Sequence, residues 1–501
     1  MSFCIILFSD IPKIEHRIAH CAPFFYMVKL IRKKPSRKGW NNMAFYGRDK
    51  QRALLHTLFE NDEMQVVLLY GRRRVGKSEL LKQALRETNT RSIYYECKQT
   101  TEKNNVDSLA EIVSHQFQFP PLAFTSMESI LDFLFKQSVK ENLIVVLDEY
   151  PYLRNAVQGL DSILQSLADT YRDNAHLKFV LCGSYVEVMQ SLLEVANPLY
   201  GRIDRTIALH PMDYWESALF YPDFCPEDKV RLYSVFGGIP YYNRLIDTSL
   251  TAQENITELI ASPGARLENE VSMYLRSEVS RIVNANEVFE TLAKGFYRFS
   301  DILSQSHVSS SPTLVDVLDK LIRMELVKKE APINDERNRR KAGYVICDPL
   351  SLFYYRYCFR YASQLRIMDP AAFYELNIRE DFETWYVPRW FEEICRQYLI
   401  RCNLAGRMPV TFTKIGKYWY DDPKQHKNGE FDLVTLDANG YIFYEAKFTK
   451  EPVTEATMKQ EIQQVNETGL ACYKYGFFSR SGFADTEMEN VIQIKLEQLY
   501  E

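Results

Sequence analysis

The strongest constraint on the fold is an alternation of apolar runs and helical segments between residues 45 and 190. Four segments are predicted strands: MQVVLLYG (64–71), RSIYYECK (91–98), NLIVVLDEYPYL (142–153) and the start of LKFVLCGSYVEVM (177–189). One segment with helical apolar spacing precedes these strands, at 47–61, and four lie between them, at 77–86, 106–118, 126–141 and 158–173. Buried strands that alternate with helices are typical of an α/β, doubly wound parallel sheet, which binds ligands at the carboxyl ends of its strands.

One motif joins the first of these strands to the next helix. It comprises Gly71, Arg72, Arg73, Arg74, Val75, Gly76, Lys77 and Ser78, followed by Glu79, and it matches GxxxxGK[ST]. Its glycines let the backbone curl around phosphate, and the helix N-terminus adds positive potential. The pattern predicts an ATP site in which Lys77 reaches the β- and γ-phosphates and Ser78 ligates Mg²⁺. The three arginines add positive potential at positions where the pattern tolerates most residues.

Acidic residues follow the strand at 142–153. Asp148 ends the apolar run LIVVLD, where an aspartate that holds the metal ion is expected, and Glu149 is the predicted general base. Ser184, after FVLCG, is either a γ-phosphate sensor or a helix cap. Arg202 is the predicted arginine that stabilises the transferring phosphoryl group, in cis or from a neighbouring subunit; the alternative is a solvated side chain.

The pattern changes after residue 206, and a chain of 501 residues has room for two to four domains. We predict a P-loop ATPase core over 43–210 and a helical subdomain over 211–284. Helices followed by two strands predict a winged helix over 285–350, with its recognition helix near 312–328. The remaining domain, 351–501, begins with aromatic-rich helices and ends in the order strand, hairpin, strand, helix and strand.

A second group of polar residues lies in GEFDLVTLDANGYIFYEAKFTK (429–450), where Asn439-Gly440 predicts a hairpin. Alternation places Glu445 and Lys447 on one face of the second strand, and the hairpin brings Asp432 beside them. With Glu393 or Glu392 from the preceding helix, these residues form a candidate nuclease cluster that binds Mg²⁺. The alternative is an exposed hairpin with cross-strand ion pairs.

The distribution of charge along the chain limits how it could contact nucleic acid. The net charge is −5, but residues 1–42 carry +6, so the rest carries −11 and any contact with nucleic acid must come from local patches. We interpret residues 1–42 as a disordered leader or as sequence upstream of a true start at Met43, rather than as a basic tail for nucleic acid or a membrane surface. The ten cysteines are scattered singly, as in reduced cytoplasmic proteins, and no apolar run approaches the ~18 residues that span a bilayer.

Several stretches carry a family resemblance. GRRRVGKSELL, VVLDEYPYL, VLCGSYVEVM, PLYGR and GGIPYY together resemble the archaeal-type DExx-box ATPases, which are related to STAND and AAA+ P-loop NTPases. KLIRMELVKKEAPI resembles their winged helix, and FEEICRQYL, FDLV, YEAKF and FFSRSGF their C-terminal domain of unknown function, which is similar to PD-(D/E)xK nucleases. The resemblance spans about 43–501 and implies the same nucleotide and nuclease-type residues named above. Two positions depart from it: Phe431 replaces a proline, and Ser184 replaces an asparagine or threonine.

These observations predict a Mg²⁺-dependent ATP-binding protein and ATPase whose nucleotide state is coupled to a winged helix and a nuclease-like domain. Two alternatives stay open: an ATP-gated, metal-dependent DNA nuclease, and a slowly hydrolysing STAND-like switch that binds protein partners. The expected partners are ATP, duplex DNA at the winged helix and the C-terminal domain, and further copies of the chain. The expected location is the cytoplasm, without a membrane.

Overall fold

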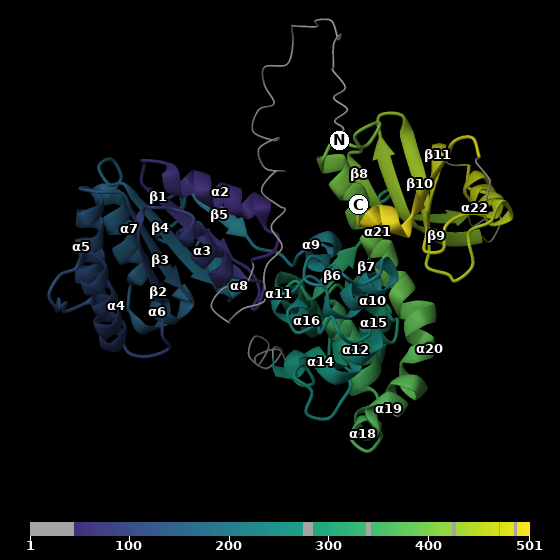
Figure 1. The fold of residues 1–501 in the computed structure, drawn as a ribbon, viewed down its shortest axis with the longest axis horizontal. Helices are drawn as coiled ribbons and strands as arrows, with labels where there is room; N and C mark the ends of the chain where they lie inside the picture. The colour runs from purple at the N-terminus through teal and green to yellow at the C-terminus, as the bar shows by residue number, and fades with distance from the viewer. Residues whose placement is uncertain (1–44, 274–283, 337–341, 423–426, 470, 485–487) are drawn as a thin grey trace, which may run out of the picture. The chain divides into compact units, whose positions relative to one another are not determined.

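The first part of the chain folds as a five-stranded parallel sheet in the order β2-β3-β4-β1-β5 (Figure 1). Its strands are β1 (Gln65–Tyr70), β2 (Arg91–Glu96), β3 (Leu143–Asp148), β4 (Leu177–Gly183) and β5 (Arg205–Ala208). The computed structural model describes residues 45–273, 284–336, 342–422, 427–469, 471–484 and 488–501. The predicted parallel sheet is confirmed, whereas the leader expected at 1–42 lies outside the described residues.

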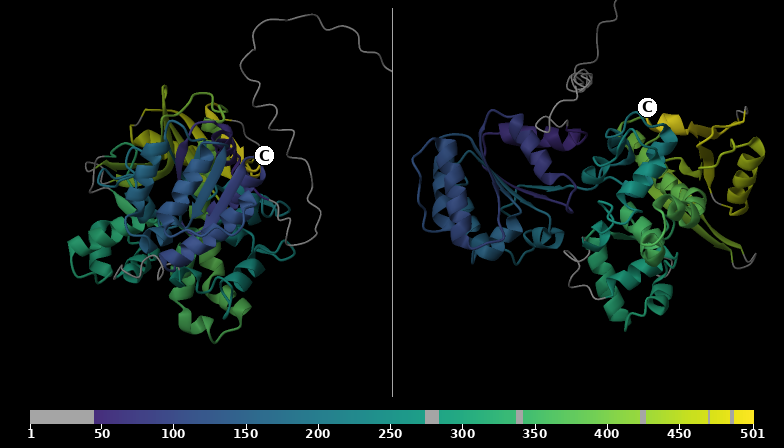
Figure 2. Two further views of the ribbon diagram at one scale, coloured as in Figure 1. Left: turned by 90° about the vertical axis from the view of Figure 1, so that its left-hand side faces the viewer. Right: turned by 60° about the horizontal axis from the view of Figure 1, so that its bottom comes forward.

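Helices cover both faces of this sheet (Figure 2). They are α2 (Asp49–Glu60), α3 (Lys77–Arg86), α4 (Glu102–Phe117), α5 (Met127–Ser138), α6 (Tyr150–Ala156), α7 (Leu160–Tyr171) and α8 (Val186–Ser191). Apolar residues of α4 to α7 share one core with one face of the sheet. Right-handed crossovers place α3 on the opposite face, where it contacts α2. Strands β3 and β4 are buried along their whole length, which explains their continuous apolar sequences.

The strand order creates the place for a ligand. From β1 the chain crosses to β2 at one edge of the sheet, and β3 and β4 then fill the positions between β2 and β1. From β4 the chain crosses past β1 to β5 at the other edge. Connections that leave neighbouring strands in opposite directions open a crevice at the carboxyl ends. The loops after β1, β3 and β4 therefore meet at one edge.

The middle of the chain is helical. Its elements are α9 (Tyr214–Ala218), α10 (Pro226–Phe236), α11 (Pro240–Asn243), α12 (Ala252–Leu259), α14 (Ala285–Ala293), α15 (Phe299–Gln305), α16 (Ser311–Arg323) and the antiparallel pair β6 (Val327–Glu330) and β7 (Gly343–Ile346). Helix α10 ends at Phe236, before Gly237 and Gly238, and α11 begins at Pro240. Part of the helical subdomain predicted over 211–284 and part of the segment between β6 and β7 lie outside the described residues.

The last part begins with helical turns and π-helices and ends in a mixed sheet. The helical elements are α17 (Pro349–Phe353), η2 (Tyr354–Phe359), α18 (Ala362–Leu365), α19 (Pro370–Asn377), α20 (Arg379–Asp381), η3 (Phe382–Tyr386), α21 (Val387–Leu404), α22 (Glu455–Glu467) and η4 (Leu496–Leu499). The sheet has the order β12-β11-β10-β9-β8, from β8 (Lys414–Asp422), β9 (Lys427–Asp437), β10 (Gly440–Lys447), β11 (Cys472–Ser479) and β12 (Val491–Lys495). Strands β8 to β10 are antiparallel, as the predicted hairpin requires, whereas β10 to β12 are parallel.

The antiparallel pair β6–β7 is attached to this second sheet. Beyond β6, the backbone N–H of Ile333 donates to the carbonyl of Lys417 on β8 at 2.8 Å. The side chain of Asn334 exchanges two hydrogen bonds with the backbone of Trp419, at 2.8 and 3.3 Å. The segment after β6 therefore runs along the edge strand β8.

Candidate functional site

The motif after β1 forms a loop of the kind that binds phosphate. The loop runs from the end of β1 to Lys77, the first residue of α3. Gly76 has φ of +97°, a left-handed conformation that favours glycine, and a Cβ at Gly71 would lie 2.2 Å from the carbonyl oxygen of Leu209. The sequence therefore folds as the predicted strand, loop and helix, with the backbone N–H groups of the helix N-terminus at the loop.

Lys77 is folded back into this loop. Its ammonium group donates to the carbonyl oxygens of Gly71 and Arg72, at 2.8 and 3.1 Å, and to the hydroxyl oxygen of Ser184 at 2.8 Å. The residue is only 4% exposed.

Asp148 lies beside Ser78, as predicted. The Ser78 hydroxyl donates to the Asp148 carboxylate at 2.6 Å, and Tyr94 of β2 donates to the same oxygen. Burial alone would raise the pKa of Asp148, but hydrogen bonds from Cys182, Ser78 and Tyr94 outweigh it and lower that pKa. An ionised carboxylate next to a hydroxyl is a hard oxygen donor set that fits Mg²⁺. Sequence reasoning missed Tyr94, which carries no signal beyond its place in a strand.

Glu149 and Ser184 meet at the same edge. Ser184 donates its hydroxyl hydrogen to Glu149 at 2.6 Å while accepting from Lys77, so the three side chains form a chain. Glu149 precedes α6 with φ of +54°, which is unusual for a residue other than glycine. The structure thus brings together Lys77, Ser78, Asp148, Glu149 and Ser184 from the ends of β1, β3 and β4.

The loop arginines have separate partners. Arg72 is bound to Asp348 at 2.7 Å in an ion pair whose side chains are each 4% exposed. Arg73 donates to the hydroxyls of Tyr185 and Tyr152, at 2.9 and 3.4 Å.

Other predicted residues of the motif lie at its edges. Arg74 pairs with Glu270 and stacks on Tyr241, with 4.3 Å to the ring centre. Val75 is buried, and Glu79 is exposed in the first turn of α3. The contacts of Arg74 show that the segment after α10, part of GGIPYY, also borders the loop.

Arg202 is not brought to this site. Its guanidinium binds Asp169 of α7 at 2.9 Å and the carbonyls of Pro198 and Tyr200, rather than any residue of the loop. The structure thus places Arg202 against α7, where Asp169 binds its side chain, and its predicted role in stabilising the phosphoryl group, in cis or from a neighbouring subunit, stays a prediction.

The C-terminal residues form a second polar cluster. Lys447 of β10 binds Glu445 at 2.7 Å, as their common face predicts, and Glu461 of α22 at 2.9 Å. Asp432 of β9 binds Lys417 of β8 at 3.1 Å. Burial raises the pKa of Glu445 to about 6; Lys447 opposes this rise, while Glu461 and Asp432 add to it.

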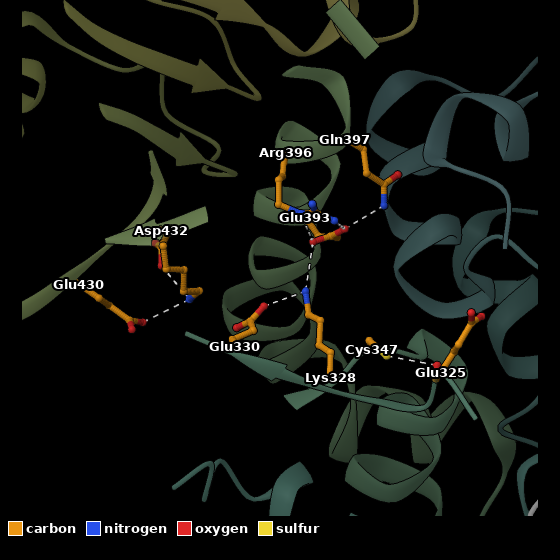
Figure 3. A network of polar contacts seen from close by, with 10 residues as sticks. Glu325, Lys328, Glu330, Cys347, Glu393, Arg396, Gln397, Glu430 and Asp432 are labelled. Carbon is orange, nitrogen blue, oxygen red and sulfur yellow. Dashed lines mark hydrogen bonds and ion pairs between the residues drawn. The ribbon is translucent and has the colours of Figure 1, made fainter. Parts of the chain in front are cut away.

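The choice between two glutamates on α21 is settled by the phase of the helix. Glu393 points away from the cluster and binds Arg396 at 2.5 Å and Lys328 at 3.6 Å (Figure 3). Although burial favours its neutral form, Lys328 and Arg396 lower the pKa of Glu393 to about 2. Glu392 is the residue near Asp432 and Glu445: burial raises its pKa to about 8, and the Asp432 charge adds to the effect. Of the two glutamates named as candidates, the structure brings Glu392 and not Glu393 beside Asp432, because successive helical residues point about 100° apart.

A cavity of about 730 Å³ lies among β6, β7, α21, β8 and β9. Arg72 and Asp348 line one part of it, and Glu392, Lys417 and Asp432 line another. Among the described residues, no three His, Cys, Asp or Glu side chains converge closely enough to hold a metal ion. None of the helices in the described ranges is both long and apolar enough to cross a membrane.

Two family models match the chain. Residues 45–245 match an ATPase domain predominantly from archaea, and residues 354–464 match a domain of archaeal and bacterial proteins of unknown function. An uncharacterized protein of Methanocaldococcus jannaschii is 26% identical over 408 residues, which is 81% of this chain and 87% of the relative.

Solved structures give weaker likenesses. A Walker-type ATPase of Pyrococcus abyssi is 23% identical, with a TM-score of 0.48, over 62% of this chain and 96% of that one. The ORC2 protein of Aeropyrum pernix is 14% identical, with a TM-score of 0.40, over 63% and 94% of the two chains. On the sheet, the loop geometry and the two family models, the chain carries an ATPase domain of the predominantly archaeal type, followed by a domain that archaeal and bacterial proteins of unknown function share.

Proposed function

We propose that the chain hydrolyses ATP in a Mg²⁺-dependent reaction at the loop after β1. The observation that carries this proposal is the convergence of Ser78 on Asp148 at 2.6 Å and of Lys77, Ser184 and Glu149 in one hydrogen-bonded chain. Ser78 and Asp148 would hold Mg²⁺, which when bound with ATP neutralises phosphate charge. Lys77 would turn from its loop carbonyls to the β- and γ-phosphates.

Glu149 is the proposed general base. Its carboxylate, two hydrogen bonds from Lys77 through Ser184, would accept a proton from the water that attacks the γ-phosphorus. The chemistry then rests on positioning and on electrostatic stabilisation rather than on a covalent intermediate.

Substitutions at two positions test this function. Lys77→Ala should abolish binding of ADP and ATP in isothermal titration, whereas Glu149→Gln should keep binding and stop phosphate release. Lys136→Ala, on an exposed i,i+4 pair of α5, is the matched control and should behave as wild type. Unimpaired turnover in the Lys77 or Glu149 variant would contradict the proposal.

The Arg72–Asp348 pair supports a further element, the coupling of nucleotide state to the C-terminal half. The backbone carbonyl of Arg72 accepts a hydrogen bond from Lys77. When Lys77 turns to a bound phosphate, Arg72 therefore loses this backbone contact. Asp348 follows β7 and caps α17 by accepting from the backbone N–H of Ser351 at 2.9 Å. A buried pair 276 residues apart in sequence thus links the nucleotide site to the elements around β6–β7.

A metal-dependent nuclease is the second candidate. The observation that favours it is the electrostatic coupling of Glu392, Asp432 and Glu445: burial and mutual repulsion raise the pKa values of Glu392 and Glu445, although the three carboxylates of the described structure would have to move closer together to hold a metal ion. Carboxylates that are held close together despite their mutual repulsion are typical of a site that a bound cation stabilises. A bound Mg²⁺ or Mn²⁺ would supply Lewis-acid activation, and Lys447 would orient the water.

The nuclease test uses supercoiled plasmid. Lys447→Ala should lose the metal-dependent nicking of wild type, while Lys459→Ala, an exposed lysine paired with Glu455 on α22, should keep it. Equal nicking by wild type and Lys447→Ala, or none by wild type, would refute this second function.

We also propose that residues 285–350 form a winged helix, in which α14 to α16 are followed by the strand pair β6–β7. The outward basic residues of α16 are committed to acids: Lys320 binds Asp316 at 2.7 Å and Arg323 binds Glu187 at 3.0 Å. Helix α16 therefore presents to the phosphate backbone of DNA little positive charge that is not already paired. Duplex DNA would have to contact other parts of the domain, in line with the negative charge outside the leader.

A further inference from the structure

The second arginine of the phosphate-binding loop lies in a tyrosine clamp. The Arg73 guanidinium donates to the Tyr185 hydroxyl at 2.9 Å and to the Tyr152 hydroxyl at 3.4 Å. It also lies 5.2 Å from the centre of the Tyr185 ring, and the two tyrosine rings meet edge to face with 5.9 Å between centres. The side chain is half-buried.

The clamp is built on the two segments that carry the catalytic chain. Tyr152 lies three residues after Glu149 on α6, and Tyr185 directly follows Ser184. Glu149 and Ser184 are themselves joined at 2.6 Å, and Ser184 is joined to Lys77. The clamp therefore holds the Arg73 guanidinium at the edge of the loop where the γ-phosphoryl group would lie.

The other candidate arginines are held elsewhere by carboxylates. Arg72 is buried against Asp348, Arg74 pairs with Glu270, and Arg202 pairs with Asp169. Hydrogen bonding to Tyr185 and burial raise the pKa of Tyr152 to about 12. At neutral pH Tyr152 therefore contacts the Arg73 guanidinium through a neutral hydroxyl.

We propose that Arg73 is a catalytic residue that stabilises the γ-phosphoryl group in the transition state, and that Tyr152 and Tyr185 are its positioning residues. This inference rests on the proposed ATPase function. The water oxygen forms a bond to the γ-phosphorus while the bond from that phosphorus to the bridging oxygen breaks, and the bridging oxygen leaves on ADP with the electron pair. Glu149 takes a proton from the water and passes it to the inorganic phosphate. Arg73 donates hydrogen bonds to the equatorial oxygens, where negative charge gathers.

Arg73→Ala should lower kcat by roughly a hundredfold or more, since an arginine in this role contributes ~10³ or more in related phosphoryl transfers. The KM for ATP and the affinity for ADP should change less than threefold. Arg73→Lys should recover only part of kcat, because an ammonium lacks the planar fork of a guanidinium. Tyr185→Phe should lower kcat roughly tenfold. Arg172→Ala, a surface arginine paired with Asp204, is the control for a lost positive charge.

A second readout does not depend on turnover. With ADP, Mg²⁺ and aluminium fluoride, which mimics the transferring phosphoryl group, wild type should retain ADP through gel filtration. Arg73→Ala should lose this retention while still binding ADP alone in titration. Loss of ADP binding itself would assign Arg73 to ground-state binding and overturn the proposal.

The two failures can be told apart. If wild type neither binds nor hydrolyses ATP, the proposed function fails. If wild type turns over and Lys77→Ala does not, but Arg73→Ala keeps wild-type kcat and traps ADP with aluminium fluoride, only the role of Arg73 fails.

Discussion

Removal of the Asp348 carboxylate tests the buried link between the phosphate-binding loop and the C-terminal half. Asp348→Ala leaves the Arg72 guanidinium buried without its partner at 2.7 Å, and both side chains are only 4% exposed in the native pair. Breaking such a pair costs about 3–5 kcal/mol. Loss of the α17 cap adds about 1 kcal/mol, so we expect the free energy of unfolding to fall by about 4–6 kcal/mol.

Two further variants separate the contributions of the ion pair and of the helix cap to this loss of unfolding free energy. Asp348→Asn keeps an oxygen that can cap α17 and accept from Arg72 but removes the charge, and should cost about 2 kcal/mol. Asp369→Ala removes an exposed cap of α19, where the side chain accepts from two backbone N–H groups, and should cost about 1 kcal/mol.

The assay is urea unfolding followed by tryptophan fluorescence. Four of the five tryptophans, Trp215, Trp385, Trp390 and Trp419, lie beyond the parallel sheet, so most of the signal follows the half of the chain to which Asp348 belongs; the fifth, Trp40, precedes the sheet. The transition of Asp348→Ala should shift to lower urea with an unchanged slope. A loss below about 1 kcal/mol, equal to that of Asp369→Ala, would show that the ion pair contributes nothing and would refute the reasoning.

Two other predictions follow from the sites. Tyr94→Phe removes one of the hydrogen bonds that hold Asp148 ionised, so the Mg²⁺ concentration for half-maximal ATP hydrolysis should rise roughly fivefold, and a magnesium titration that matches wild type would contradict this. The raised pKa of Glu392 means that the folded state favours its neutral form; that stabilisation is complete below the unfolded pKa near 4.5 and is lost as the pH rises to about 8. Glu392→Gln should therefore flatten the fall in unfolding free energy between pH 5 and 8, measured by urea unfolding at each pH, and an unchanged slope would argue against a buried, repelled carboxyl at this position.

The nucleotide site was largely predictable because its signals are local. The strand, the glycine loop and the start of α3 occupy one continuous stretch, and Asp148 ends a fully buried strand. The topology of a parallel sheet then brings Asp148 and Ser184 to the loop without further information. The hairpin between β9 and β10 was predictable for the same reason, but its two-residue turn is Ala438–Asn439 rather than Asn439-Gly440, because Asp437 pairs directly with Gly440.

The parts that sequence reasoning missed depend on helix phase or on distant contacts. Glu392 and Glu393 are adjacent, and only the packing of α21 against β9 and β10 decides which of them faces Asp432. Arg202 follows the catalytic core in sequence, but α7 supplies Asp169 as its partner. The pairing of Arg72 with Asp348 joins residues 276 positions apart, and no local sequence pattern predicts such a contact.

The most direct test of the central claim is parallel measurement of ATP binding and phosphate release for wild type and Glu149→Gln. The pairing of Ser78 with Asp148 predicts that wild type releases phosphate only with Mg²⁺. The variant should bind ATP with wild-type affinity but turn over at least about a hundredfold more slowly, the loss expected for a general base. Wild-type turnover in Glu149→Gln, or phosphate release by wild type that is independent of Mg²⁺, would contradict the account.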